Sequence, residues 1–258
     1  MDIANALILS GVIIFLYMTA MFTVAVQRRD NSVADIAWGP GFILVAGAAF
    51  IVAEDYLVRQ ALVLGTVTVW GLRLASRIYR RNRGKGEDPR YQQWREEWGS
   101  SWMLRSYLQV FLLQGFFMWL ISLPVVVIMA VSSDSLGWPD LLGGLVWLMG
   151  FLFEAVADRQ LDNFLSDETN RGKILQSGLW RYSRHPNYFG EVFQWWGIFL
   201  IALSIPGAWW TIAGPLTITW LILFVSGVPL LEKSMRRNPE FREYASRTSV
   251  FIPLPPKQ

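Results

Sequence analysis

The sequence contains no cysteine and only one histidine among its 258 residues. Without thiols, the chain can form no disulfide, no thiolate nucleophile and no thiolate metal ligand. A metal site built from several histidines is excluded in the same way, although carboxylates alone can still bind metals. We therefore predict no metal ion.

Charged residues are also scarce, at 17% of the chain, whereas 53% of the residues are hydrophobic and 14 are tryptophan. This composition favours a lipid bilayer over water as the surroundings of the chain. The lysines and arginines occur in clusters between apolar runs and do not form a basic face, so we predict no nucleic-acid partner. Glycine-rich phosphate loops and nucleophile elbows are absent from the sequence, so arginines would have to bind any phosphate.

Long apolar runs fill most of the sequence, and each is close to the ~20 residues that a helix needs to cross a bilayer. The second run starts least clearly, because Asp35 and a Gly39-Pro40-Gly41 turn interrupt it. We predict an all-α membrane bundle, a single domain over residues 1–258, with a retained first helix. The seven predicted spans lie near 3–26, 34–53, 57–79, 107–131, 139–158, 188–204 and 208–230.

Basic residues alternate between the connections of these spans. The connections 54–56, 132–138 and 205–207 contain no lysine or arginine, whereas 27–33, 80–106, 159–187 and the tail after 230 contain several. Because basic loops stay on the cytoplasmic side, the N-terminus is expected outside and the C-terminus inside. A multi-pass protein of a bacterial inner membrane fits this pattern.

Three ionisable residues within or beside the predicted spans call for an explanation. Arg73 and Arg77 share a face of the third span, where they either extend toward the inner surface or bind an anionic ligand. Asp35 shares a face with Asn31 and Trp38. It either interacts favourably with the helix dipole or, if buried, acts as an acid.

The sequence just before the sixth predicted span is unusually polar for a membrane boundary. It reads Trp-Arg-Tyr-Ser-Arg-His-Pro-Asn-Tyr-Phe-Gly-Glu over residues 180–191 and includes the only histidine. An ordinary helix cap needs a single serine, aspartate or asparagine, so this cluster favours a site that binds a polar ligand. The tail over 239–253 is either a surface anchor or a cover for that site.

These motifs resemble the steroid 5-alpha-reductase family, in particular its bacterial membrane branch. The resemblance rests on Arg184-His185-Pro186-Asn187-Tyr188 with Gly190-Glu191, on Asp158 and Arg171, on the Asn82-Arg83-Gly84 loop, and on the final Phe251-Ile252-Pro253. It covers nearly the whole chain and is strongest from 154 to 253. It implies a seven-helix membrane enzyme that uses NADPH to reduce a carbon–carbon double bond conjugated to a ketone.

The resemblance also implies a role for individual residues. Asp35 and Asn31 would be catalytic and lie near the substrate carbonyl, and Trp38 and Trp70 would line the path of a flat, apolar, steroid-like substrate that enters from the bilayer. The implied cofactor-binding residues are Arg73, Arg77, Asn82, Arg83, Asp158, Arg171, Lys173, Tyr182, Arg184, His185, Asn187, Tyr188, Glu191, Tyr244 and Arg247.

One position departs from the family pattern. Trp70 stands where the family's catalytic tyrosine is expected, three residues before the matched Arg73, and an indole is not a practical proton donor. The Arg-His-Pro core also resembles isoprenylcysteine carboxyl methyltransferases, which use S-adenosylmethionine. Glu191 and the arginines from 73 to 83 favour the reductase. A lipid-binding or transport protein without a cofactor is the third alternative.

Overall fold

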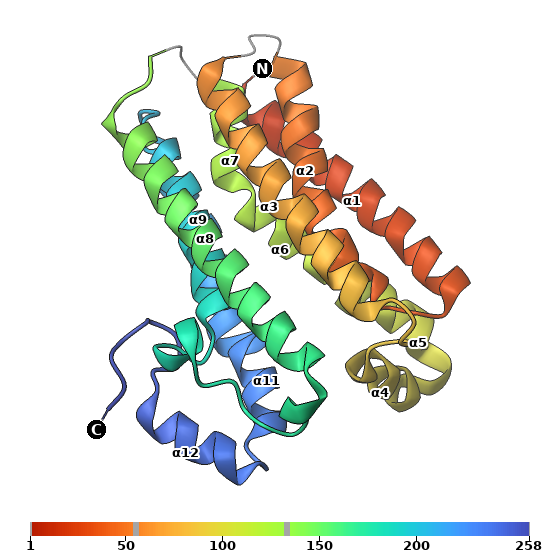
Figure 1. Cartoon of the computed structure of the whole chain (residues 1–258). Coiled ribbons are helices and arrows are strands. Elements are labelled where there is room, and N and C mark those ends of the chain that lie inside the picture. The colour runs from red at the N-terminus through yellow and green to blue at the C-terminus, as the bar shows by residue number, and fades with distance from the viewer. Residues whose placement is uncertain (1, 54–56, 132–134, 258) are drawn as a thin grey trace. The chain divides into compact units, whose positions relative to one another are not determined.

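The computed structural model describes residues 2–53, 57–131 and 135–257, and these form helices without any strand (Figure 1). The predicted connection 54–56 and residues 132–134 of the next one lie outside the described part. The chain divides into two compact units. Unit 1 comprises Met1–Asp140 with Ala202–Gly214, and unit 2 comprises Leu141–Ile201 with Pro215–Gln258. The prediction of a single membrane domain stays a prediction.

Three long helices open unit 1: α1 (Ile3–Arg28), α2 (Val33–Ala53) and α3 (Val58–Asn82). The expected interruption at Gly39-Pro40-Gly41 is wrong, because α2 continues through Pro40. The two backbones touch at Gly39 and Gly71, where a Cβ atom on Gly39 would clash with the Gly71 carbonyl. The glycines therefore allow α2 and α3 to pack closely rather than forming a turn.

The rest of unit 1 is built from shorter pieces: α4 (Pro89–Trp98), a 3-10 turn Gly99–Ser101, α5 (Trp102–Arg105), a π-helical segment Ser106–Leu112, α6 (Leu113–Ile121), α7 (Leu123–Val131) and a 3-10 segment Ala208–Ile212. The predicted span 107–131 is thus divided at Ser122. A buried ion pair, with Arg59 Nε 2.7 Å from Asp140 Oδ1, joins the start of α3 to the start of α8.

Unit 2 contains most of α8 (Trp138–Ser166), two 3-10 turns at Glu168–Asn170 and Gly178–Arg181, then α9 (Pro186–Ala202), most of α10 (Ala213–Trp220), a π-helical segment Leu221–Val225, α11 (Val228–Met235) and α12 (Pro239–Arg247). The backbones of α8 and α9 meet at glycines, since a Cβ atom on Gly190 would lie 2.5 Å from the Gly150 carbonyl oxygen. This close approach brings polar side chains of the two helices together.

Six helical stretches of the described residues are long and apolar enough to cross a membrane: Ile3–Arg28, Val33–Ala53, Val58–Asn82, Pro89–Ile121, Trp138–Ser166 and Ala208–Met235. The chain is therefore an integral multi-pass membrane protein. Each stretch coincides at least in part with a predicted span. The remaining predicted span, 188–204, corresponds to α9, which has 17 residues. The count of seven spans and the placement of the termini stay predictions.

Candidate functional site

A polar cluster surrounds Asp35 at the start of α2 in unit 1. The Tyr91 hydroxyl of α4 donates a hydrogen bond to Asp35 Oδ1 at 2.6 Å, and the Arg90 guanidinium lies 3.2 Å from Asp35 Oδ2. Tyr91 is buried, whereas the Asp35 side chain is 21% exposed. The cluster therefore combines a partly exposed carboxyl group and cation with a buried phenol at the start of α2.

Asn31, the second predicted catalytic residue, lies directly before this helix and is fully buried. Its backbone N–H donates to Glu87 Oε1 at 2.8 Å, and its side-chain amide donates to Ser106 Oγ at 2.9 Å. The side-chain oxygen Oδ1 has no hydrogen-bond partner among the described residues. An acceptor that is buried in this way calls for a donor from a ligand or from water.

The two tryptophans predicted to bind substrate belong to one aromatic cluster. The Trp38 and Phe42 ring centroids are 5.3 Å apart, and those of Phe42 and Trp70 are 5.6 Å apart, both in edge-on geometry. Trp70 is buried and Trp38 is half-buried. The structure thus brings both predicted residues together through Phe42, which sequence reasoning did not select.

The predicted cofactor residues of unit 1 lie on the second half of α3 and just after it. Arg73 and Arg77 are half-buried on the helix, one turn apart. Asn82 ends the helix, and its side-chain oxygen accepts a hydrogen bond from Arg81 at 3.2 Å. Arg83 follows it and is exposed. These residues form a cationic end of α3.

A seam of polar side chains runs between α8 and α9 in unit 2. Asn187 donates to Asp158 Oδ1 at 3.1 Å, and Gln194 donates to Glu154 Oε2 at 2.6 Å. Glu191 lies between the two amides on the same face of α9, because residues 187, 191 and 194 follow the helical repeat. Three predicted cofactor residues, Asp158, Asn187 and Glu191, are therefore neighbours in the structure. Glu154 and Gln194 extend the seam further into the helix pair.

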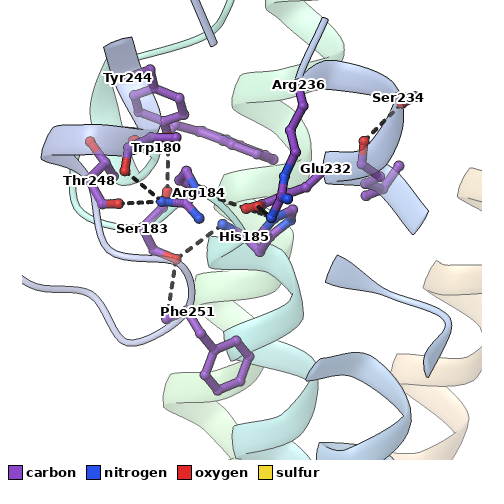
Figure 2. Close-up of polar contacts among 12 residues, drawn as sticks. Trp180, Ser183, Arg184, His185, Glu232, Ser234, Arg236, Tyr244, Thr248 and Phe251 are labelled. Carbon is purple, nitrogen blue, oxygen red and sulfur yellow. Dashed lines mark hydrogen bonds and ion pairs between the residues drawn. The ribbon is translucent and has the colours of Figure 1, made fainter. Parts of the chain in front are cut away.

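Arg184, a predicted cofactor residue, contacts Glu232 and the C-terminal tail. Its Nε donates to Glu232 Oε1 at 2.8 Å, and its Nη1 donates to the Ala245 and Thr248 carbonyl oxygens at 2.9 and 2.8 Å (Figure 2). Its backbone N–H also bonds to the Ser249 carbonyl oxygen. The side chain is only 9% exposed. These bonds tie the segment before α9 to the C-terminal tail.

The tail adds further bonds to the same segment. The Tyr244 hydroxyl of α12 donates to the carbonyl oxygens of Trp180 and Ser183, the latter at 3.2 Å, and Ser183 Oγ donates to the Phe251 carbonyl oxygen at 2.8 Å (Figure 2). Burial raises the pKa of Tyr244 well above 10, so its hydroxyl stays protonated. The tail is therefore a structural cover of the loop that precedes Asn187.

The remaining predicted cofactor residues lie at the surface or beside this loop. Arg171, Lys173 and Tyr182 are exposed. Arg247 forms an exposed ion pair with Glu243 at 2.8 Å. The Tyr188 ring stacks on His185, with centroids 5.6 Å apart. The exposed cations remain accessible to an anionic ligand.

Protonation of His185 is expected to destabilise the fold. Its Nε2 lies 3.2 Å from Glu232 Oε1, yet burial outweighs this attraction and lowers the pKa of His185 below 6.5. Because folding lowers its pKa, neutral His185 contributes its full share of stability above about pH 6.5. This contribution is lost as the pH falls through the pKa of the folded state. The thermal midpoint should therefore fall between about pH 6.5 and 5, a window in which ordinary carboxylates stay ionised. His185→Gln should flatten this slope, and an unchanged slope would contradict the assignment.

Besides Phe42, sequence reasoning missed several polar residues of these clusters, among them Tyr91, Glu154, Gln194 and Glu232. Glu154 carried a signal, because a carboxylate within a predicted span calls for an explanation. Gln194 follows Glu191 on the same helical face and could have been found in the same way. Tyr91 and Glu232 meet their partners across 56 and 48 residues of sequence. No local pattern marks such contacts.

Comparison with known proteins identifies the family. A family model described as a protein of unknown function, DUF1295, matches residues 21–248. The chain belongs to this family. Among related proteins, 3-oxo-5-alpha-steroid 4-dehydrogenase 1 of Bos taurus is 31% identical over 124 residues, which cover 48% of this chain and 45% of that protein. The match thus spans less than half of that relative's length.

Two further relatives of this chain come from yeasts. An uncharacterized protein of Schizosaccharomyces pombe is 24% identical over 96% of this chain and 80% of its own length. The Delta(14)-sterol reductase of Saccharomyces cerevisiae is 34% identical over 38% of this chain and 23% of its own length. No solved structure matches. The resemblance to the steroid 5-alpha-reductases is confirmed at the level of the family.

Proposed function

We propose that this protein is a membrane reductase that uses NADPH to saturate a carbon–carbon double bond conjugated to a ketone in a flat, apolar lipid such as a 4-ene-3-ketosteroid. The family and the relatives named for steroid and sterol chemistry support a reductase. The observation that carries the proposal is the hydrogen bond between Tyr91 and Asp35, because it supplies an acid in a chain that lacks the expected tyrosine at position 70.

The residues of unit 2 fit a nicotinamide dinucleotide. Their seam offers hydrogen-bonding groups for a polar, uncharged ring system, and it includes a buried acceptor, Gln194 Oε1, without a partner among the described residues. Asn187 and Glu191 would hold the nicotinamide and ribose. Arg171 and Lys173, which are exposed, would bind phosphates, since cations suit a multiply charged anion. When bound, NADPH supplies a hydride to the substrate.

Arg184 and His185 would act indirectly. The Arg184 bonds described above go to Glu232 and the tail, and His185 lies against Glu232. We therefore assign both residues to holding the loop that leads into Asn187. Within unit 1, the cationic end of α3, formed by Arg73, Arg77, Asn82 and Arg83, is suited to bind an anionic group.

The Asp35 cluster would act on the ketone. Reduction of an enone places negative charge on the carbonyl oxygen, and a positioned hydrogen-bond donor stabilises that charge. The Tyr91 hydroxyl can donate its proton to this oxygen while a protonated Asp35 replaces it. The carboxylate that remains on Asp35 then faces Arg90 at 3.2 Å. Trp38 and Trp70 would contact the apolar rings of the substrate.

The assay for this proposal is NADPH oxidation by purified protein in lipid, with a 4-ene-3-ketosteroid added. We expect consumption of NADPH only when the steroid is present. Glu191→Ala should weaken retention of the cofactor, because it removes a carboxylate from the seam. Native mass spectrometry measures that retention directly. Recovery of S-adenosylmethionine would favour a methyltransferase, and the absence of any cofactor would favour a lipid-binding or transport protein; either result contradicts the proposal.

A further inference from the structure

The amide of Gln194 has a fixed orientation in unit 2. Its Nε2 lies 2.6 Å from Glu154 Oε2 and 3.3 Å from the Gly190 carbonyl oxygen. A carbonyl oxygen and an ionised carboxylate can both accept hydrogen bonds but cannot donate them. The amide nitrogen of Gln194 must therefore point toward Glu154 and the Gly190 carbonyl. The amide oxygen therefore points elsewhere. An exchange of the two atoms would place oxygen against two acceptors, which is unfavourable.

The amide oxygen of Gln194 is a buried acceptor without a partner. The residue is 1% exposed, and Oε1 forms no hydrogen bond with any described residue. Buried polar atoms in native proteins almost always have partners, so Oε1 calls for a donor that the described chain does not provide. Gln194 lies eight residues after the start of α9, about 12 Å along the helix at ~1.5 Å per residue. A donor at this depth belongs to an elongated ligand or to a buried water.

The other groups of the seam restrict the chemistry of that ligand. Glu154, Asp158 and Glu191 are acidic and, when ionised, accept hydrogen bonds, and the Gly190 carbonyl does the same. Such a surface disfavours phosphate and other anions and favours a neutral or cationic group with several N–H donors. A primary carboxamide on a pyridine ring meets this requirement, since the amide nitrogen offers two N–H donors.

We propose that Gln194 binds the carboxamide N–H of the nicotinamide ring through Oε1, with Glu154 holding the glutamine in this orientation. The proposal rests on the proposed function and deepens it, because it names the atom at which the buried end of the cofactor is recognised. The site should discriminate against a ligand that lacks this N–H, because such a ligand leaves Gln194 Oε1 buried without a hydrogen bond.

The test compares binding of two nucleotides. One is NADP⁺, and the other is its 3-acetylpyridine analogue, in which a methyl ketone replaces the carboxamide and removes both N–H donors. Dissociation constants are measured by quenching of tryptophan fluorescence with purified full-length protein in lipid. We expect the wild type to bind NADP⁺ about tenfold more tightly than the analogue, the usual effect of one hydrogen bond. Gln194→Met, of similar shape but without an acceptor, should reduce that ratio to about one.

A matched control and a second variant make the outcome decisive. Gln176→Met changes an exposed glutamine and should keep the tenfold ratio. If Gln194→Met fails to fold, Gln194→Asn retains the amide but withdraws its oxygen by one methylene and should also lower the ratio. Equal binding of both nucleotides by the wild type would overturn the assignment and leave a water as the partner. Failure to bind either nucleotide would overturn the proposed function itself.

Discussion

A Tyr91→Phe variant is expected to lose about 10²- to 10⁴-fold in turnover, the usual contribution of a positioned proton donor, while retaining NADPH. The substitution removes only the hydroxyl that bonds to Asp35 at 2.6 Å and leaves the ring packed against Trp94, whose centroid lies 5.5 Å away. The proposed cofactor-binding residues of unit 2 are unchanged. Turnover is measured as product formed under saturating NADPH, and retention is measured by native mass spectrometry.

Tyr107→Phe is the matched control, because it removes a half-buried hydroxyl that bonds to Thr19 at 3.0 Å in the same unit. That variant should keep turnover within about twofold of the wild type. Asp35→Asn separates proton transfer from a structural role of Asp35. The amide still accepts a hydrogen bond from Tyr91 but cannot supply a proton to the Tyr91 oxygen. It should be as slow as Tyr91→Phe. Full activity in either variant would remove the pair from the mechanism.

An Arg184→Ala variant is expected to lose about 3–5 kcal/mol of folding free energy, the usual cost of breaking a buried ion pair. The substitution would leave Glu232, which is 5% exposed, without its strongest partner, and would free the carbonyl oxygens of Ala245 and Thr248. Thermal unfolding followed by tryptophan fluorescence measures the change. Loss of cofactor retention should follow the loss of stability.

Two variants show whether the buried pair causes this effect. Arg247→Ala breaks an exposed ion pair with Glu243 and should change stability by only about 0–1 kcal/mol. The double variant Arg184→Met with Glu232→Met removes both buried charges together and should recover most of the stability. A stable Arg184→Ala protein that fails only in NADPH binding would instead support the phosphate-binding role that the family resemblance implies.

The sequence by itself determined the class of the protein. Apolar runs and clustered cations were enough to predict a helical, multi-pass membrane protein, because the length of a span and its lack of charge are local properties. The motif around Asn187 and Glu191 was also enough to place the chain in its family. The family resemblance further implied that these residues and Asp158 bind one cofactor, and the structure brings Asn187 and Asp158 within 3.1 Å.

Only the tertiary structure decided what the polar side chains contact. Gly39-Pro40-Gly41 suggested a turn in the sequence, but in the structure α2 continues through it, and Gly39 packs against Gly71 of α3. Arg184 fitted a phosphate ligand by its motif, yet its hydrogen bonds go to Glu232 and the tail, 48 residues and more away. Hydrogen bonds depend on distances between atoms that are remote in sequence, and helical periodicity carries no information about such distances. For the same reason, only the tertiary structure, in which Tyr91 of α4 lies beside Asp35 of α2, shows this partner of Asp35.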